Sequence, residues 1–443
     1  MAAARKQRPR PGGRAGDARA AALWLLHEVL ERRRPLDDAL AQALAGDGRM
    51  AALSARDRAF ARLLTGTVLR RLGQLDDAIA RCLDRPLNRR GAAARDPLRL
   101  AAAQLMFLDT PPHAAVDAAV RQVARTPGLK GLVNAVARRL AREGADIAAA
   151  QDAERLNCPD WLWQSWSAAY GEPATRSMVA VLLADPPLDL SLRDAGEADA
   201  WAERLEAELL PTGTLRRRGG GAVATLPGYD EGAWWVQDAA AALPVRLLPA
   251  LAGQRVIDLC AAPGGKTAQL AAAGARVTAV DISSGRLQRV AENLARLRLA
   301  AETVAADATS WQPPAPADAV LLDAPCTSTG TIRRHPDVWR LKQPDDVAAV
   351  TGLQDRLLAA AAAMLRPGGT LVYCVCSLQP EEGPARIDRL LAGGAPLRRQ
   401  PLRPAELAGL GELIDDAGDL RTLPHQLGGM DGFFACRLQR QGG

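Results

Sequence analysis

The sequence predicts an α/β protein whose C-terminal half forms a doubly wound, mostly parallel sheet and whose N-terminal third is all helical. In residues 255–377, short apolar runs rich in Val, Leu and Ile alternate with helical patterns such as 283–299 and 346–365. Apolar strands separated by helices are typical of a parallel sheet that is covered by helices on both faces. In residues 18–145, apolar side chains instead recur with helical spacing.

Four segments follow from these patterns and from the residues that interrupt them. Asp109–Pro112 should end one of the N-terminal helices, because proline restricts its own backbone and that of the preceding residue. Between the two main regions the patterns are shorter and mixed, which indicates a small α+β module. We expect a disordered basic tail at 1–17, a helical domain at 18–145, the α+β module at 146–230 and the doubly wound α/β domain at 231–443.

Composition limits the class of protein and its partners. The chain is 48% hydrophobic and 24% charged, which is typical of a soluble globular protein. Its net charge of +6 favours a polyanionic partner such as nucleic acid, although an Ala/Arg-rich coding bias gives the same value. We find no membrane span and no signal peptide, and the seven scattered cysteines predict reduced thiols. We therefore expect a cytoplasmic protein, acting as a monomer.

Polar or reactive side chains follow five successive strands of the predicted sheet, at the edge where open α/β folds bind ligands. These groups are Cys260–Thr267, Asp281, Asp307, Asp323–Gly330 and Cys374–Ser377. Each group alone is common at the end of a strand. Their ordered recurrence predicts a functional site.

The first of these groups also indicates the kind of ligand. The glycines of Cys260–Thr267 allow close approach to the backbone and to the amides that begin the next helix. Asp281 lies 23 residues beyond Asp258, where an acid can bind ribose hydroxyls. The segment is not GxGxxG, and the chain has no GxxxxGK[ST] phosphate loop. An adenosine ligand without a pyrophosphate fits best, which predicts S-adenosylmethionine as the cofactor.

Four longer segments carry a more specific pattern: "VIDLCAAPGGKT" (256–267), "LLDAPCTSTGTIRRHPD" (321–337), "YCVCSLQPEEG" (373–383) and "HQLGGMDGFFACRL" (425–438). They closely resemble the bacterial Sun/RsmB family of RNA cytosine-5 methyltransferases, which is related to the nucleolar NOP/Sun proteins. The helical stretches 56–71, 98–120 and 132–143 look like the NusB-like domain of that family. The resemblance implies a Rossmann-like class I methyltransferase domain, an RRM-like middle module and 16S ribosomal RNA as the substrate.

The resemblance further implies covalent catalysis by two cysteines. Cytosine C5 is a poor nucleophile until a thiolate adds to C6 and turns the ring into an enamine. The family pattern makes Cys376 this nucleophile and assigns Cys326 to product release or proton removal. Asp323 should hydrogen-bond the N3 and N4 edge of an unstacked base and also contact the cofactor. The resemblance implies no metal.

The expected cofactor contacts are carried over in the same way. Asp281 should bind the ribose hydroxyls, and Asp307 should lie beside the adenine. Lys266 alternatively pairs with a substrate phosphate. Arg333 and Arg334 either hold RNA phosphates or form a solvated charge pair. The methionine end of the cofactor should lie against Cys260, Ala261, Ala262, Pro263, Gly264, Gly265 and Lys266.

The sequence departs from the family pattern at two points. Val375 replaces the usual threonine before the nucleophile, and "CTSTG" replaces the more usual "CSGTG". Neither change removes a reacting atom, but the missing hydroxyl leaves the hydrogen bonding of Cys376 open. We expect the strand to end between Tyr373 and Val375, so that Cys374 packs in the core and Cys376 emerges at the sheet edge.

Three other functions stay open. A methyltransferase acting on tRNA or another rRNA site fits the same residues, because specificity lies in the helical and middle regions. A DNA cytosine methyltransferase fits less well, because such enzymes use the Pro-Cys cysteine and do not need Cys376. A non-catalytic RNA-binding ribosome-assembly factor has no reason to hold both cysteines. A zinc site is disfavoured, because the histidines form no ligand-spaced pair and Cys82, Cys158 and Cys436 read as buried apolar residues.

Overall fold

The computed structural model describes residues 17–89, 91–219 and 221–442, and the chain divides into two compact units. The first unit holds the residues up to Asp160 together with His335–Leu341, and the second holds Trp161–Arg334 and the residues from Lys342 onward. Of the predicted tail, residues 1–16 lie outside the described residues. Asp17 caps the first helix by accepting a hydrogen bond from the Arg19 amide at 2.9 Å.

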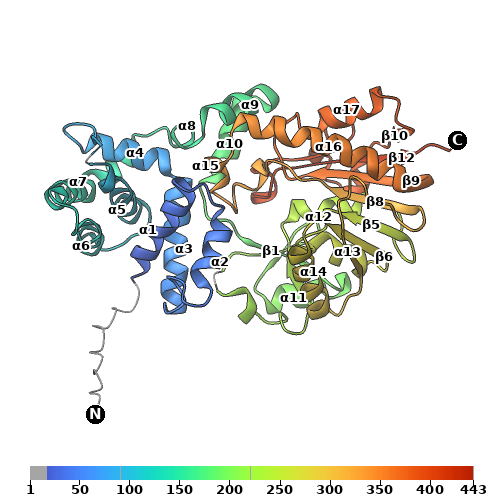
Figure 1. Cartoon of the computed structure of the whole chain (residues 1–443), viewed down its shortest axis with the longest axis horizontal. Coiled ribbons are helices and arrows are strands. Elements are labelled where there is room, and N and C mark those ends of the chain that lie inside the picture. Colours follow the sequence, from blue (N-terminus) through green and yellow to red (C-terminus); the bar gives the residue numbers. More distant parts are fainter. Residues whose placement is uncertain (1–16, 90, 220, 443) are drawn as a thin grey trace, which may run out of the picture. The chain divides into compact units, whose positions relative to one another are not determined.

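The first unit is helical, as the periodicity predicts (Figure 1). Its core consists of apolar side chains such as Leu25, Leu64, Val68 and Val133, all 0% exposed. The helices are α1 (Ala18–Leu30), α2 (Leu36–Leu44), α3 (Ala55–Arg70), α4 (Leu72–Arg81), α5 (Arg95–Phe107), α6 (Pro112–Gln122), α7 (Leu129–Ala149), α8 (Ala153–Asn157) and the later α15 (Val338–Leu341).

Helix α15 belongs to this unit although it lies in the C-terminal half of the sequence. The Arg33 guanidinium donates to the carbonyl oxygens of Arg340 and Leu341, each at 2.5 Å. The buried Asp337 carboxylate accepts a hydrogen bond from the Leu36 amide at 3.0 Å. Sequence analysis did not predict that residues 335–341 belong to the helical unit. Their local sequence does not indicate that their partners lie about 300 residues earlier in the chain.

The second unit begins with helices and a small antiparallel sheet. The sheet has the order β2-β3-β1-β4, and Leu190, Trp201, Leu215 and Trp234 form its core. The RRM-like fold of this module stays a prediction. Its elements are α9 (Asp160–Tyr170), α10 (Glu172–Leu182), β1 (Leu188–Leu192), α11 (Ala198–Arg204), β2 (Glu208–Leu209), β3 (Leu215–Arg217) and β4 (Trp234–Val236).

The larger sheet of the second unit has the order β10-β12-β9-β8-β5-β6-β7, and β11 pairs with β12. Strands β5 to β9 pair in parallel, whereas β10, β11 and β12 are antiparallel to their neighbours. The predicted mostly parallel sheet is therefore confirmed, with an antiparallel edge. The strands are β5 (Arg255–Leu259), β6 (Arg276–Asp281), β7 (Glu302–Ala305), β8 (Ala317–Asp323), β9 (Leu365–Val375), β10 (Leu397–Arg399), β11 (Leu420–Thr422) and β12 (Phe433–Arg440).

Helices cover both faces of this sheet, as the doubly wound fold requires (Figure 1). One face packs against α16 (Pro344–Met364) and α17 (Pro384–Ala392), and the other packs against α12 (Ala239–Arg246), α13 (Gly265–Ala272) and α14 (Ser284–Leu297). Helix α16 is long and apolar enough to cross a membrane, but Leu357, Leu358 and Ala361 bury its apolar side against the sheet. It is therefore a core helix of this unit.

Strand order reverses between β5 and β8, which run in parallel side by side. A crevice opens at such a switch point beyond the carboxyl ends of the strands. Two glycines shape the loops there. Gly264 has φ +98°, and a Cβ on it would lie 3.0 Å from the Val290 side chain. A Cβ on Gly330 would lie only 1.8 Å from the Gly432 carbonyl oxygen, so no larger residue fits between these two loops.

Candidate active site

A cavity of about 440 Å³ lies in the second unit at the carboxyl ends of β5 and β8. Its wall includes the loop after β5, the loop after β8 and the residue after β9. Of the predicted site residues, this wall brings together Cys260, Ala261, Ala262, Pro263, Gly265, Lys266, Asp323, Cys326 and Cys376. Gly264, Asp281 and Asp307 are not part of it.

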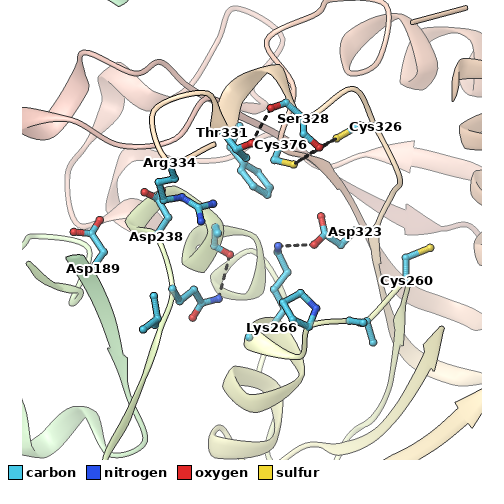
Figure 2. Close-up of a pocket in the computed structure, with 18 of the residues that line it drawn as sticks. Asp189, Asp238, Cys260, Lys266, Asp323, Cys326, Ser328, Thr331, Arg334 and Cys376 are labelled. Atoms are coloured by element: carbon cyan, nitrogen blue, oxygen red, sulfur yellow. Dashed lines mark hydrogen bonds and ion pairs between the residues drawn. The ribbon is translucent and has the colours of Figure 1, made fainter. Parts of the chain in front are cut away.

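The two cysteines named for catalysis lie side by side. Their sulfur atoms are 3.5 Å apart, and Figure 2 shows them directed toward each other. Strand β9 ends at Val375, so Cys374 is fully buried in the sheet whereas Cys376 emerges half-buried at the cavity. As the sequence predicts, Cys374 therefore packs in the core while Cys376 reaches the edge of the sheet.

The two thiols differ in acidity. The hydrogen bond from Cys326 lowers the pKa of Cys376 below the ordinary thiol value, against the opposing effect of burial. The same hydrogen bond and burial raise the pKa of Cys326 well above that value. Burial, helped by the neighbouring Asp323 carboxylate, raises the pKa of Cys260 to about 12. Among the three thiols on this wall, Cys376 is therefore the one that most readily forms a thiolate, and its role as the nucleophile stays a prediction.

The Ser328 hydroxyl completes the surroundings of the sulfur atoms. Its oxygen lies 3.7 Å from the Cys376 sulfur and 3.9 Å from the Cys326 sulfur. Ser328 occupies the glycine position of the usual "CSGTG" pattern and has φ +58°, a conformation that glycine adopts without strain. Val375, the other departure, is 0% exposed in the core beneath α16 and does not reach the cavity.

Lys266 and Asp323 form an ion pair on the cavity wall, with 2.7 Å between the ammonium nitrogen and Oδ2 (Figure 2). Burial by itself would lower the pKa of Lys266, but the Asp323 carboxylate raises it above its ordinary value. The Lys266 ammonium also lies 4.9 Å from the centre of the Phe433 ring. This cavity therefore holds a fixed ammonium–carboxylate pair near Cys376.

Asp258 provides a test of whether a cationic cofactor fits the cavity. It lies at the end of β5, is 0% exposed and accepts a hydrogen bond from Thr267 at 2.6 Å through Oδ2. Its Oδ1 faces no hydrogen-bond donor among the described residues, and burial raises the pKa of Asp258 to about 7. A buried carboxylate oxygen with no donor, on the wall of a cavity of this size, fits a ligand that carries positive charge.

The remaining acids predicted for the cofactor hold the loops themselves. Asp281 ends β6 and accepts hydrogen bonds from the Ala262 amide at 3.2 Å and the Ser283 amide at 3.0 Å. Asp307 is exposed and accepts hydrogen bonds from both the amide and the hydroxyl of Thr309, which lower its pKa. Their contacts with the ribose and the adenine stay predictions.

Arg333 and Arg334 belong to a buried cluster of charges. Arg333 is 1% exposed and pairs with Asp238, so the solvated alternative is wrong for this residue. Arg334 pairs with Asp431 at 2.5 Å and also lines the cavity. These ion pairs join the loop after Cys326 to the start of α12 and to the "GGMDG" segment. A phosphate contact by Arg334 stays a prediction.

Sequence analysis missed cavity residues that come from outside the strand-end groups. Asp189 on β1 and Asp238 before α12 both line the cavity, and so does Phe433 on β12. Asp189 binds the buried Arg216 guanidinium through both carboxylate oxygens, at 2.7 and 2.8 Å. Asp238 before an alanine-rich helix is a recognisable N-cap signal. Nothing in the local sequence identifies Asp189 or Phe433 as a cavity residue.

Two family models match the chain. The model described as 16S rRNA methyltransferase RsmB/F matches residues 245–439, and the NusB family model matches residues 16–142. Curated relatives include ribosomal RNA small subunit methyltransferase B of Erwinia tasmaniensis, 35% identical over 96% of this chain and 98% of the relative. The Xylella fastidiosa protein of the same name is 37% identical over 95% of this chain and 97% of the relative.

Solved structures support the same fold. The crystal structure of PH0851 matches with a TM-score of 0.72 and 23% identity, covering 96% of this chain and 99% of that chain. NSun6 from Pyrococcus horikoshii matches with a TM-score of 0.55 and 19% identity, covering 64% of this chain and 99% of that chain. The relatives are methyltransferases, a class that uses a cofactor of the S-adenosylmethionine type. By its similarity to these curated relatives over nearly their full length, the chain belongs to the 16S rRNA methyltransferase RsmB/F family.

Proposed function

We propose that this protein transfers a methyl group from S-adenosylmethionine to C5 of a cytosine in 16S ribosomal RNA, through a covalent adduct at C6. The observation that carries the proposal is the pair of thiols 3.5 Å apart, one with a lowered and one with a raised pKa, on the wall of a cofactor-sized cavity. This arrangement supplies a nucleophile and a second proton-carrying group on one side of a reacting base.

The two cysteines take different parts in the reaction. The Cys376 thiolate forms a bond to C6, and the electron pair moves to C5, which then takes the methyl group. Loss of the C5 proton restores the double bond and expels the Cys376 thiolate. Cys326, held as the neutral thiol at this separation, donates its proton to the departing Cys376 sulfur and so promotes release. The Cys326 thiolate formed in this way takes up the C5 proton, which returns Cys326 to the neutral thiol.

Lys266 and Asp323 orient the base and the cofactor. The Asp323 carboxylate is fixed by Lys266 at 2.7 Å and still has 31% of its side chain exposed, so it is accessible for hydrogen bonds from a flipped cytosine. S-adenosylmethionine supplies an electrophilic methyl group when it is bound. The residues proposed to hold it are Cys260, Ala261, Ala262, Pro263, Gly264, Gly265, Lys266, Asp281 and Asp307, with Asp258 available to a positive charge.

The substrate and the setting are inferred from the relatives and from charge. Both relatives are named as ribosomal RNA small subunit methyltransferases. The net charge of +6 favours a polyanion, and we propose that the helical region 18–145 and the module at 146–230 bind the RNA around the target base. We propose that the protein acts as a cytoplasmic monomer.

The test is bisulfite sequencing of 16S rRNA transcript after incubation with the full-length protein and S-adenosylmethionine. We expect a protected cytosine with the wild type and none with Cys376→Ala, which should still bind the cofactor. Transfer RNA and DNA serve as competing substrates in parallel reactions. Preferential methylation of tRNA would support the alternative RNA substrate, and absence of methylation in all nucleic acids would overturn the proposed activity.

A further inference from the structure

Glu382 carries a buried carboxylate that touches both cysteine-bearing loops. The residue lies between β9 and α17, is 0% exposed and is not part of the cavity wall. It is therefore not placed to touch a bound base or cofactor. The sequence analysis gave it no role.

On one side the carboxylate holds the loop that carries Cys326. Thr327, the next residue, donates its amide to Oε2 at 2.8 Å and its hydroxyl to Oε1. The Gln354 side chain on α16 donates to the same Oε2 at 3.2 Å and to the carbonyl oxygen of Pro325 at 2.9 Å. Both chain neighbours of Cys326 are thus tied to this group.

On the other side the carboxylate holds the chain that carries Cys376. Ser377, the next residue, donates its hydroxyl to Oε1 of Glu382 at 2.7 Å. The Ser377 hydroxyl oxygen is also 3.3 Å from that of Thr327, and the Gly330 amide donates to the Cys376 carbonyl oxygen at 3.1 Å. One Oε1 atom therefore joins the residues that directly follow the two cysteines.

The partners of Glu382 are all neutral donors. Within the part of the chain that the structure describes, four donors from Thr327, Ser377 and Gln354 surround the carboxylate and no cation pairs with it. The carboxylate accepts from all four, so a side chain without oxygen at this position would leave four buried donors without their acceptor. A glutamine can keep the arrangement, because the Thr327 and Ser377 hydroxyls can also accept from its amide. Burying an acid without a counter-ion is costly, so this group is poorly explained as a stabilising contact.

We propose that Glu382 is a positioning residue that holds the two cysteine loops together and so sets the 3.5 Å separation of the sulfur atoms. Its consequence for catalysis rests on the two-cysteine reaction proposed above. A displacement of about 1 Å between reacting groups costs roughly 100-fold in rate. The separation itself can be measured without any methyl transfer.

The experiment uses disulfide formation as a ruler in the full-length protein. Diamide takes two electrons and two protons from Cys326 and Cys376 and leaves one S–S bond of about 2.05 Å, so the sulfur atoms must approach each other. We expect the rate of this cross-link, followed by peptide mass spectrometry, to fall at least roughly tenfold in Glu382→Ala, and kcat to fall roughly 100-fold with an unchanged KM for the cofactor. Glu382→Gln, which can keep the four contacts, should retain most of both. Thr327→Val should change both quantities in the same direction.

Asp419→Ala is the matched control, because Asp419 is a buried acid at 1% exposure before β11 that contacts neither cysteine loop. It should cross-link at the wild-type rate. A wild-type cross-linking rate in Glu382→Ala would overturn the proposal. If that variant does not fold, Thr327→Val and Ser377→Ala decide in the same way. Inactive wild-type protein would contradict the proposed function, while the cross-linking comparison would still judge the role of Glu382.

Discussion

Replacing Cys326 with alanine should make Cys376 less acidic, because the substitution removes the donor that stabilises its thiolate. The sulfur atoms are 3.5 Å apart, and this hydrogen bond is the largest cause of the lowered pKa of Cys376. A hydrogen bond to a charged group contributes about 1.5–3 kcal/mol, and we take the lower value because sulfur is a weak donor. At about 1.4 kcal/mol per tenfold change in an equilibrium constant, the thiolate of Cys376 should become about tenfold less favourable, so the pKa of Cys376 should rise.

The measurement is the rate at which iodoacetamide alkylates Cys376, followed by peptide mass spectrometry across a pH series. Only the thiolate reacts, so below its pKa the rate in Cys326→Ala should be about tenfold lower than in the wild type. Cys158→Ala, a change in the helical unit, serves as the control and should leave the profile unchanged. A profile of Cys326→Ala that stays at the wild-type pH or moves to lower pH would refute this reasoning.

Three further predictions follow from the cavity. Asp258 has a pKa of about 7 and is protonated at lower pH, whereas a cationic cofactor favours its carboxylate form. The affinity of the protein for the cofactor, measured by calorimetry, should therefore increase as the pH rises toward 7, by up to about tenfold per pH unit. In Asp258→Asn this affinity should not depend on pH. Lys266→Met removes the partner of Asp323 and should lower kcat/KM by about 10–100-fold, or about 1.4–2.7 kcal/mol; unchanged kinetics would contradict a role for the pair. Ser328→Gly should relieve the left-handed backbone conformation and raise the free energy of unfolding, measured in denaturant, by about 1 kcal/mol. It should also slow alkylation of Cys376, because it removes the hydroxyl beside that sulfur; faster alkylation would contradict a stabilising contact between Ser328 and Cys376.

The strand-end residues could be predicted from sequence because topology alone brings them together. The carboxyl ends of parallel strands share one edge, so Lys266, Asp323 and Cys376 had to converge once the strands were recognised. The split between Cys374 and Cys376 likewise follows from where β9 ends. Local patterns sufficed for these features.

The buried polar partners could not be predicted, because they depend on contacts between distant segments. Arg333 pairs with an acid 95 residues away, and Glu382 accepts from Thr327, 55 residues earlier. An arginine pair after a loop has the same local sequence whether it is solvated or buried. The inclusion of His335–Leu341 in the helical unit depends in the same way on Arg33.

The division of labour between the two cysteines is tested most directly by trapping the covalent intermediate. Cys326→Ala, incubated with full-length 16S rRNA and S-adenosylmethionine, should accumulate a protein–RNA adduct that survives a denaturing gel, because release is impaired. Mass spectrometry should place the RNA on Cys376, and the double variant Cys326→Ala/Cys376→Ala should form no adduct. An adduct that persists in the double variant, or no adduct with Cys326→Ala under turnover, would contradict the account.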